Sequence, residues 1–182
     1  MVYSASVEIS VVRTDGHKDR FYVVRSNGSE VSWSFPTYGD GLPHDLVHLV
    51  VEAAFGVRKG IWKRVDEGMD IARVNAAANR KRGKAKYEGS ALGVERGEVL
   101  LSEALAGIRW LDRSTSDEER HREASFAFDR AGLEAPPLDT CVAVRETLTS
   151  LGEKWRALAP KGALDFHFDP EAAKLTLVGK EG

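Results

Sequence analysis

Residues 4–35, SASVEISVVRTDGHKDRFYVVRSNGSEVSWSF, decide the fold class of this chain. In the first part of this stretch, Val7, Ile9 and Val11 alternate with polar residues, which is the period-2 pattern of a strand with one face toward a core. The segments TDGHKD and SNG supply turn residues, and RFYVVR and EVSWSF continue as further strands. The stretch therefore predicts a three-stranded antiparallel meander with one apolar face.

The residues after this meander carry helical patterns that would cover the apolar face of the sheet. Helices are expected from about Pro43 to Phe55, Gly60 to Asn79, Glu98 to Asp112, Ser116 to Gly132 and along a stripe from Cys141 to Leu158. Near the end, ALDFHF and LTLV predict a hairpin that extends the first sheet. The expected class is α+β, with an N-terminal three-stranded antiparallel meander, about five helices and a C-terminal β-hairpin in one domain over residues 1–182.

Composition places the chain among globular proteins. A length of 182 residues is enough to bury a core without disulfides, and hydrophobic residues make up 42%. No segment approaches the roughly 20 apolar residues of a membrane-spanning helix, and the first residues have a strand pattern instead of a signal-peptide pattern. Cys141 is the one cysteine, which suits a reducing compartment, so we expect a cytoplasmic protein. A net charge of −2 gives no overall attraction to nucleic acid or membranes.

Candidate metal ligands lie in the first expected helix, GLPHDLVHLVVEAAFG, residues 41–56. One helical turn separates His44 from His48, so the two imidazoles lie on one side about 6 Å apart along the axis and can reach one ion. The positive end of the helix dipole favours a neutral, metal-binding His44. Imidazole ligands favour Zn²⁺, and this pattern predicts a divalent-metal-binding protein that acts as a small hydrolase.

The five residues HDLVH resemble the zincin motif HExxH. The resemblance implies that His44 and His48 bind zinc and that Asp45 stands where the zincin glutamate activates a water. This carboxylate is one methylene shorter than the glutamate. A catalytic zinc needs a third ligand, and Glu52 lies about 12 Å from His44 along the helix, too far to share one ion. Candidates elsewhere in the chain are His17, His121, His167, Asp66, Glu67 and Asp70.

The same helix has a simpler interpretation as a buried helix with a polar edge. In this interpretation Asp45 serves the helix dipole and cap, while the histidines form hydrogen bonds with carbonyl groups or water. A longer stretch, LPHDLVHLVVE followed by GVRKGIWKRVDEGMD, resembles a recurring segment of small uncharacterised bacterial proteins, with Gly60 and Trp62 in the pattern. That resemblance implies a bacterial cytosolic protein in which the two helices form one unit, and it carries no activity.

A cluster of basic residues suggests another class of function. In NRKRGKAKY the positive side chains precede Tyr87, and such a cluster can bind phosphates next to an aromatic ring that stacks on a base. The alternative is therefore a non-enzymatic binding module that engages protein or nucleic acid through the sheet face or this loop. A solvated, solubilising loop explains the same pattern. The loop residues concerned are Arg80, Lys81, Arg82, Lys84 and Lys86.

Overall fold

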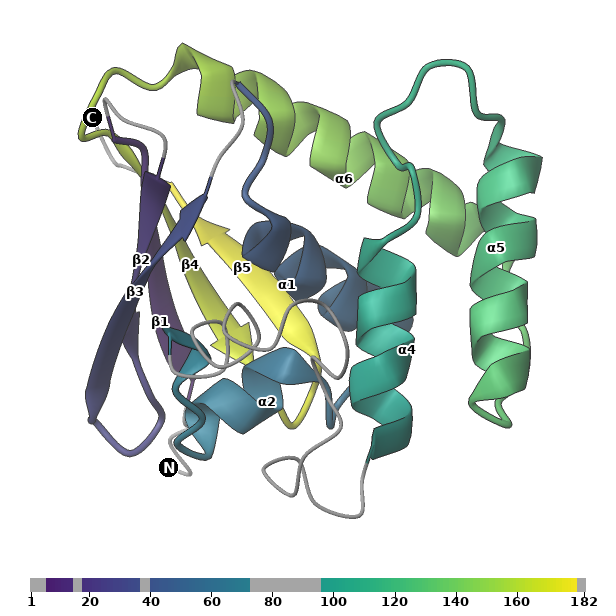
Figure 1. The fold of residues 1–182 in the computed structure, drawn as a ribbon, viewed down its shortest axis with the longest axis horizontal. Coiled ribbons are helices and arrows are strands. Elements are labelled where there is room, and N and C mark those ends of the chain that lie inside the picture. The colour runs from purple at the N-terminus through teal and green to yellow at the C-terminus, as the bar shows by residue number, and fades with distance from the viewer. Residues whose placement is uncertain (1–5, 15–17, 37–39, 73–95, 180–182) are drawn as a thin grey trace, which may run out of the picture.

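The structure of this chain, a computed structural model, describes residues 6–14, 18–36, 40–72 and 96–179. Strands and helices within these ranges form the α+β architecture in Figure 1. In chain order the elements are β1 Val7–Val12, β2 Lys18–Val24, β3 Glu30–Pro36, α1 His44–Phe55, α2 Ile61–Asp66, α4 Arg96–Ala106, α5 Asp117–Arg130, α6 Leu138–Ala157, β4 Ala163–Asp169 and β5 Lys174–Val178.

The five strands form one antiparallel sheet in the order β3-β2-β1-β4-β5. This arrangement confirms both the N-terminal meander and the terminal hairpin, which extends the sheet because β4 pairs with β1. Ile9 lies opposite Val23 on one side and Phe166 on the other, and Phe21 lies opposite Trp33. The alternating apolar residues of neighbouring strands therefore share one face, as the period-2 pattern requires.

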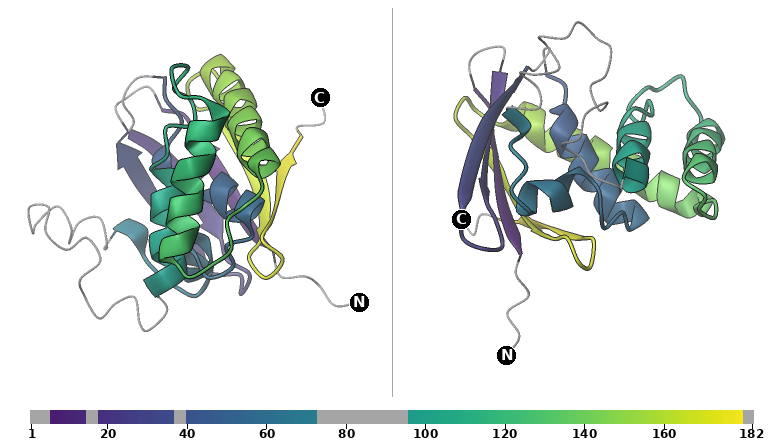
Figure 2. Two further views of the ribbon diagram at one scale, coloured as in Figure 1. Left: turned by 90° about the vertical axis from the view of Figure 1, so that its right-hand side faces the viewer. Right: turned by 60° about the horizontal axis from the view of Figure 1, so that its bottom comes forward.

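All the described helices lie on that apolar side of the sheet (Figure 2). Helix α1 packs against α4, α6 and β5, while α5 packs against α4 and α6 and lies farthest from the sheet. The opposite face carries exposed side chains, among them Arg20, Tyr22 and His167. No helix among the residues that the structure describes is both long enough and apolar enough to cross a bilayer.

Two predicted helix boundaries were wrong. The helix expected from Gly60 to Asn79 is interrupted, because α2 ends at Asp66 and Gly68 adopts a φ of 107° that a helix cannot contain. Residues 71 and 72 are helical again, and residues 73–79 lie outside the described part of the chain. The helix expected to reach Asp112 ends at Ala106. There the Trp110 indole N–H donates to the Leu105 carbonyl at 2.8 Å, which holds the chain as it turns back.

The remaining boundaries agree closely with the predictions. Gly56 follows α1 with a left-handed φ of 68°, and α5 begins at the predicted position, where Ser116 and Glu119 form a capping box. The four tryptophans lie in the core, where none of them is more than 3% exposed. Cys141 is fully buried in the α6 stripe, where burial raises the pKa of its thiol to about 11.

Candidate functional site

The polar stripe of α1 faces α4 and forms a contact that we call the α1–α4 seam. Each helix of the seam contributes buried polar groups to an otherwise apolar interface, and His48, Glu52 and Ser102 are each at most 2% exposed. Buried polar groups of this kind require partners, so their hydrogen bonds determine what the seam can do. The seam consists of His44, His48 and Glu52 from α1 and of Ser102 and Glu103 from α4.

Glu52 caps the neighbouring helix α2. Its Oε1 accepts the Ile61 N–H at 2.7 Å and its Oε2 accepts the Trp62 N–H at 3.1 Å, so one carboxylate satisfies two of the orphan donors at the start of α2. The residue at the N-cap position, Gly60, has no side chain to do this. A Cβ added to Gly60 would lie 2.4 Å from the Glu52 carboxyl carbon, so only glycine leaves room for the carboxylate.

Ser102 connects Glu52 to His48. The Ser102 hydroxyl donates to Glu52 Oε1 at 2.6 Å, and Ser102 Oγ lies 2.8 Å from His48 Nδ1. A hydroxyl has a single hydrogen, so when Ser102 donates to the carboxylate its oxygen accepts the N–H of His48 Nδ1. In this arrangement a neutral His48 carries its lone pair on Nε2.

Burial raises the pKa of Glu52 to about 7, although the hydrogen bonds from Ser102, Trp62 and Ile61 act in the opposite direction. Desolvation therefore outweighs three donors at this carboxyl group. The chain from Glu52 through Ser102 to His48 thus contains an acid that titrates near neutral pH.

The outer end of the seam is less buried. His48 Nε2 lies 3.7 Å from Glu103 Oε1, and the Glu103 side chain is 24% exposed. The half-buried ring of His44 meets the His48 ring edge to face, with 4.7 Å between centroids, and stacks on Phe35 from β3. Two imidazoles and one carboxylate therefore lie side by side at this end.

Asp45, the residue predicted to act as a catalytic base, has a structural partner. Its Oδ2 accepts the Trp33 indole N–H at 2.8 Å, and its backbone carbonyl accepts the Trp62 indole N–H at 3.2 Å. The residue is 7% exposed. Asp45 therefore links α1 to β3 and α2, and the α1 N-terminus has no side-chain cap. A catalytic role for Asp45 stays a prediction.

The third-ligand candidates that the structure describes, the half-buried Asp70 among them, all lie outside the seam. Asp66 accepts hydrogen bonds from the N–H and hydroxyl of Ser26, and Glu67 pairs with Arg64. His121 Nε2 lies 2.8 Å from the Pro136 carbonyl oxygen, while His167 is exposed on the outer sheet face. Among the described residues, no three His, Cys, Asp or Glu side chains are grouped closely enough to hold a metal ion as they stand.

The alternative binding surfaces are only partly described. The basic residues Arg80, Lys81, Arg82, Lys84 and Lys86 all lie outside the described residues, and so does His17. The sheet face is described, and on it the Arg20 guanidinium carbon lies 5.2 Å from the centre of the Tyr22 ring. Tyr22 is 47% exposed. Binding of protein or nucleic acid by either surface stays a prediction.

Sequence patterns missed Ser102 and Glu103, the α4 members of the seam. Ser102 stands among buried positions of α4, between Val99 and Leu105 at spacings of three. A serine within an apolar stripe indicates a buried polar partner, because an unpaired hydroxyl in a core is costly. The position of Ser102 in the stripe therefore indicates a buried hydrogen bond, but it does not indicate which residue is the partner.

The protein thus has an α+β fold in which Glu52, Ser102 and His48 form a buried series of hydrogen bonds. His44 lies against His48 at the outer end of this series. Comparison with known proteins found no matching family model, no matching curated protein and no matching solved structure.

Proposed function

We propose that the outer end of the α1–α4 seam binds a divalent metal ion, with Zn²⁺ favoured, through His44, His48 and Glu103. The observation that carries this proposal is the connection of His48 to Glu52 through Ser102. Metal-binding histidines commonly donate their other ring N–H to an oxygen partner, which selects the tautomer and the ring orientation. Ser102 supplies that partner at Nδ1, so the ligand atom is Nε2.

Distances at the seam support Glu103 as the missing third ligand. Ligand atoms around a tetrahedral zinc ion lie about 3.3 Å apart, so the 3.7 Å between His48 Nε2 and Glu103 Oε1 needs to close by about 0.4 Å. His44 and Glu103 are both partly exposed, and both side chains must turn toward Nε2 to share an ion with His48. Three protein ligands leave the fourth position for a water, which is the arrangement of a hydrolytic zinc site.

The hydrolase is the more specific form of this proposal. Zinc lowers the pKa of a bound water to near 7, so the ion itself can supply a nucleophile. Asp45 is the base predicted from the motif, but its carboxylate accepts the Trp33 indole N–H. The hydrolase depends on a bound ion, so the first experiment measures metal binding and not hydrolysis.

The test measures zinc binding by tag-free protein, with titration calorimetry and elemental analysis, in wild type, His44→Ala, Glu103→Gln and the control His167→Ala. His44 is chosen over the fully buried His48 because its side chain is partly exposed and its loss disturbs packing less. We expect one ion per chain in wild type and His167→Ala, none in His44→Ala and weaker binding in Glu103→Gln. No binding by wild type, or equal binding by all four proteins, would overturn the proposal.

A further inference from the structure

A cavity of about 720 Å³ lies between α6, the start of α5 and the loop that precedes α5. We call it the arginine cleft. Four arginines and one aspartate line it, an excess of three positive charges in a chain whose net charge is −2. Such a concentration of positive charge attracts anions into the cleft. Its polar lining includes Arg113, Arg120, Arg145, Arg156, Thr115 and Asp117.

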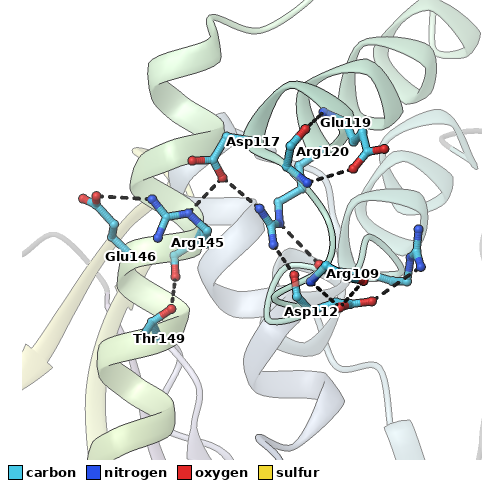
Figure 3. A network of polar contacts seen from close by, with 10 residues as sticks. Arg109, Asp112, Asp117, Glu119, Arg120, Arg145, Glu146 and Thr149 are labelled. Carbon is cyan, nitrogen blue, oxygen red and sulfur yellow. Dashed lines mark hydrogen bonds and ion pairs between the residues drawn. The ribbon is translucent and has the colours of Figure 1, made fainter.

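Two of the four arginines are already engaged with Asp117 (Figure 3). Arg120 donates to Asp117 Oδ1 at 2.9 Å and to the carbonyls of Arg109 and Asp112, so all three of its nitrogens have partners. Arg145 donates from Nε to the same Asp117 oxygen at 2.8 Å and lies 3.4 Å from Glu146 Oε1. The hydrogen bond from Arg145 lowers the pKa of Asp117, so this carboxylate stays ionised.

Asp117 and Glu146 balance the charges of Arg120 and Arg145, so the unbalanced positive charge of the cleft comes from the other two arginines. Arg113 and Arg156 have no ion-pair partner within the described ranges of the chain, and both are exposed at the cleft. On α6, the Arg156 guanidinium folds back over Gly152, where an added Cβ would lie 3.3 Å from Nη1. A glycine inside a helix costs stability, and here it leaves space for that guanidinium group beside the cleft.

A buried hydroxyl in the same cleft lacks a partner. Thr115 is 6% exposed, and its Oγ1 forms no hydrogen bond with any described residue. Buried polar atoms without partners are rare in folded proteins, because each one loses its hydrogen bonds to water. Thr115 directly precedes Ser116, the N-cap of α5, so the hydroxyl lies at the positive end of a helix of 14 residues. Oγ1 is covered in the free protein, so the Thr115 side chain must turn toward the cleft before an anion there can supply the acceptor that Oγ1 lacks.

We propose that the arginine cleft binds a small phosphomonoester, with its phosphate held by Arg113, Arg156 and the hydroxyl of Thr115. Guanidinium groups bind phosphate oxygens through charge-assisted hydrogen bonds. The cavity has the volume of a small-molecule site, so a bare phosphate would leave most of it unfilled. Leu111, which is 44% exposed, provides an apolar wall for the organic part of the ligand.

Phenyl phosphate and inorganic phosphate are suitable probes, titrated by calorimetry into wild type and three variants at pH 7.5. Arg156→Gln removes one unbalanced charge, Thr115→Val removes the hydroxyl at constant shape, and Arg122→Gln is the control. Arg122 is an exposed arginine of α5 that does not line the cleft. Thr115→Val should melt no lower than wild type, because the hydroxyl that it removes has no partner in the free protein.

We expect phenyl phosphate to bind wild type more tightly than inorganic phosphate does. The affinity should fall about tenfold or more in Arg156→Gln and several-fold in Thr115→Val, and it should not change in Arg122→Gln. The proposal is overturned if phenyl phosphate does not bind wild type, if either cleft variant binds as tightly as the control, or if inorganic phosphate binds as tightly as phenyl phosphate.

Discussion

The acidic residues of α1 each hold particular donors from another element, which explains why they interrupt an otherwise apolar helix. Glu52 accepts the first two N–H groups of α2, and Asp45 accepts the indole N–H of Trp33. A backbone or indole N–H loses its hydrogen bond to water when it is buried. Each of these carboxylates supplies an acceptor in place of that water. A substitution that displaces either carboxylate therefore leaves identifiable N–H groups without an acceptor.

Gly60→Ala should destabilise the protein strongly. The new Cβ would lie 2.4 Å from the Glu52 carboxyl carbon, so the carboxylate must leave its two N–H partners. We expect a loss of roughly 3 kcal/mol in the free energy of unfolding, measured by urea denaturation. Gly97→Ala in α4 is the matched control, because nothing lies within 4 Å of its added Cβ. That variant should be neutral or slightly more stable, and equal losses in the two variants would contradict this account of Gly60.

The raised pKa of Glu52 predicts a pH-dependent stability. The folded pKa of about 7 lies above the unfolded value near 4.5, so the folded state holds the proton more tightly. Stability linked to Glu52 is therefore fully present below about pH 4.5 and is lost as pH rises to about 7, by roughly 3 kcal/mol. The measurement is the free energy of unfolding of wild type minus that of Glu52→Gln at several pH values. A difference that stays constant or grows with pH would contradict the prediction.

The helices differ in where their caps come from. Helix α5 has a local cap, because the Glu119 N–H donates to Ser116 Oγ and the Ser116 N–H donates to Glu119 Oε2. The six-residue helix α2 is capped by Glu52, which belongs to another helix. A helix that short has little stability of its own. The position of α2 therefore depends on α1, whereas the start of α5 is defined within its own sequence.

Ser116→Ala should weaken α5 by removing its cap. The Glu119 N–H loses its acceptor, and the expected decrease in the free energy of unfolding is about 1 kcal/mol. Ser150→Ala, on an exposed position of α6, serves as the control and should change stability by less than about 0.5 kcal/mol. Urea denaturation of both variants provides the comparison. An unchanged stability in Ser116→Ala would show that the α5 cap contributes nothing.

Over the whole molecule, the sheet brings the two ends of the described chain together. Strand β1 lies at the centre, with β2 from the meander on one side and β4 from the terminal hairpin on the other. Strands β3 and β5 are the edges. The five-stranded sheet is therefore complete only when the terminal hairpin pairs with β1, after the chain has passed through the helices.

Amide hydrogen exchange should reflect this topology. The N–H groups of β1 are covered by strands on both sides, while β5 has a partner on one side and alternating exposed residues. We expect the amides of β1 to exchange more slowly than those of β5, because edges open at lower free energy than the centre of a sheet. Equal protection of β1 and β5 in a mass-spectrometric exchange experiment would be inconsistent with the strand order.

The sequence by itself determined the features that depend on neighbouring residues. Alternation at Val7, Ile9 and Val11 indicated a half-buried strand, and Ser116 with Glu119 indicated where α5 begins. These patterns are readable because strand period, helix period and local caps involve residues a few positions apart. The break at Gly68 was missed, since an apolar periodicity can continue through a glycine that ends the helix.

Only the tertiary structure decided which distant groups meet. Ser102 lies 54 positions from its partner His48, and Arg145 lies 28 positions from Asp117. Such pairs depend on how α4 and α6 pack, which no local pattern encodes. The HDLVH motif placed two histidines on one side of a helix, while the fold placed Glu103 beside them and gave Asp45 and Glu52 structural partners. The physical reason is that hydrogen bonds are local in space, whereas the residues that form them are far apart along the chain.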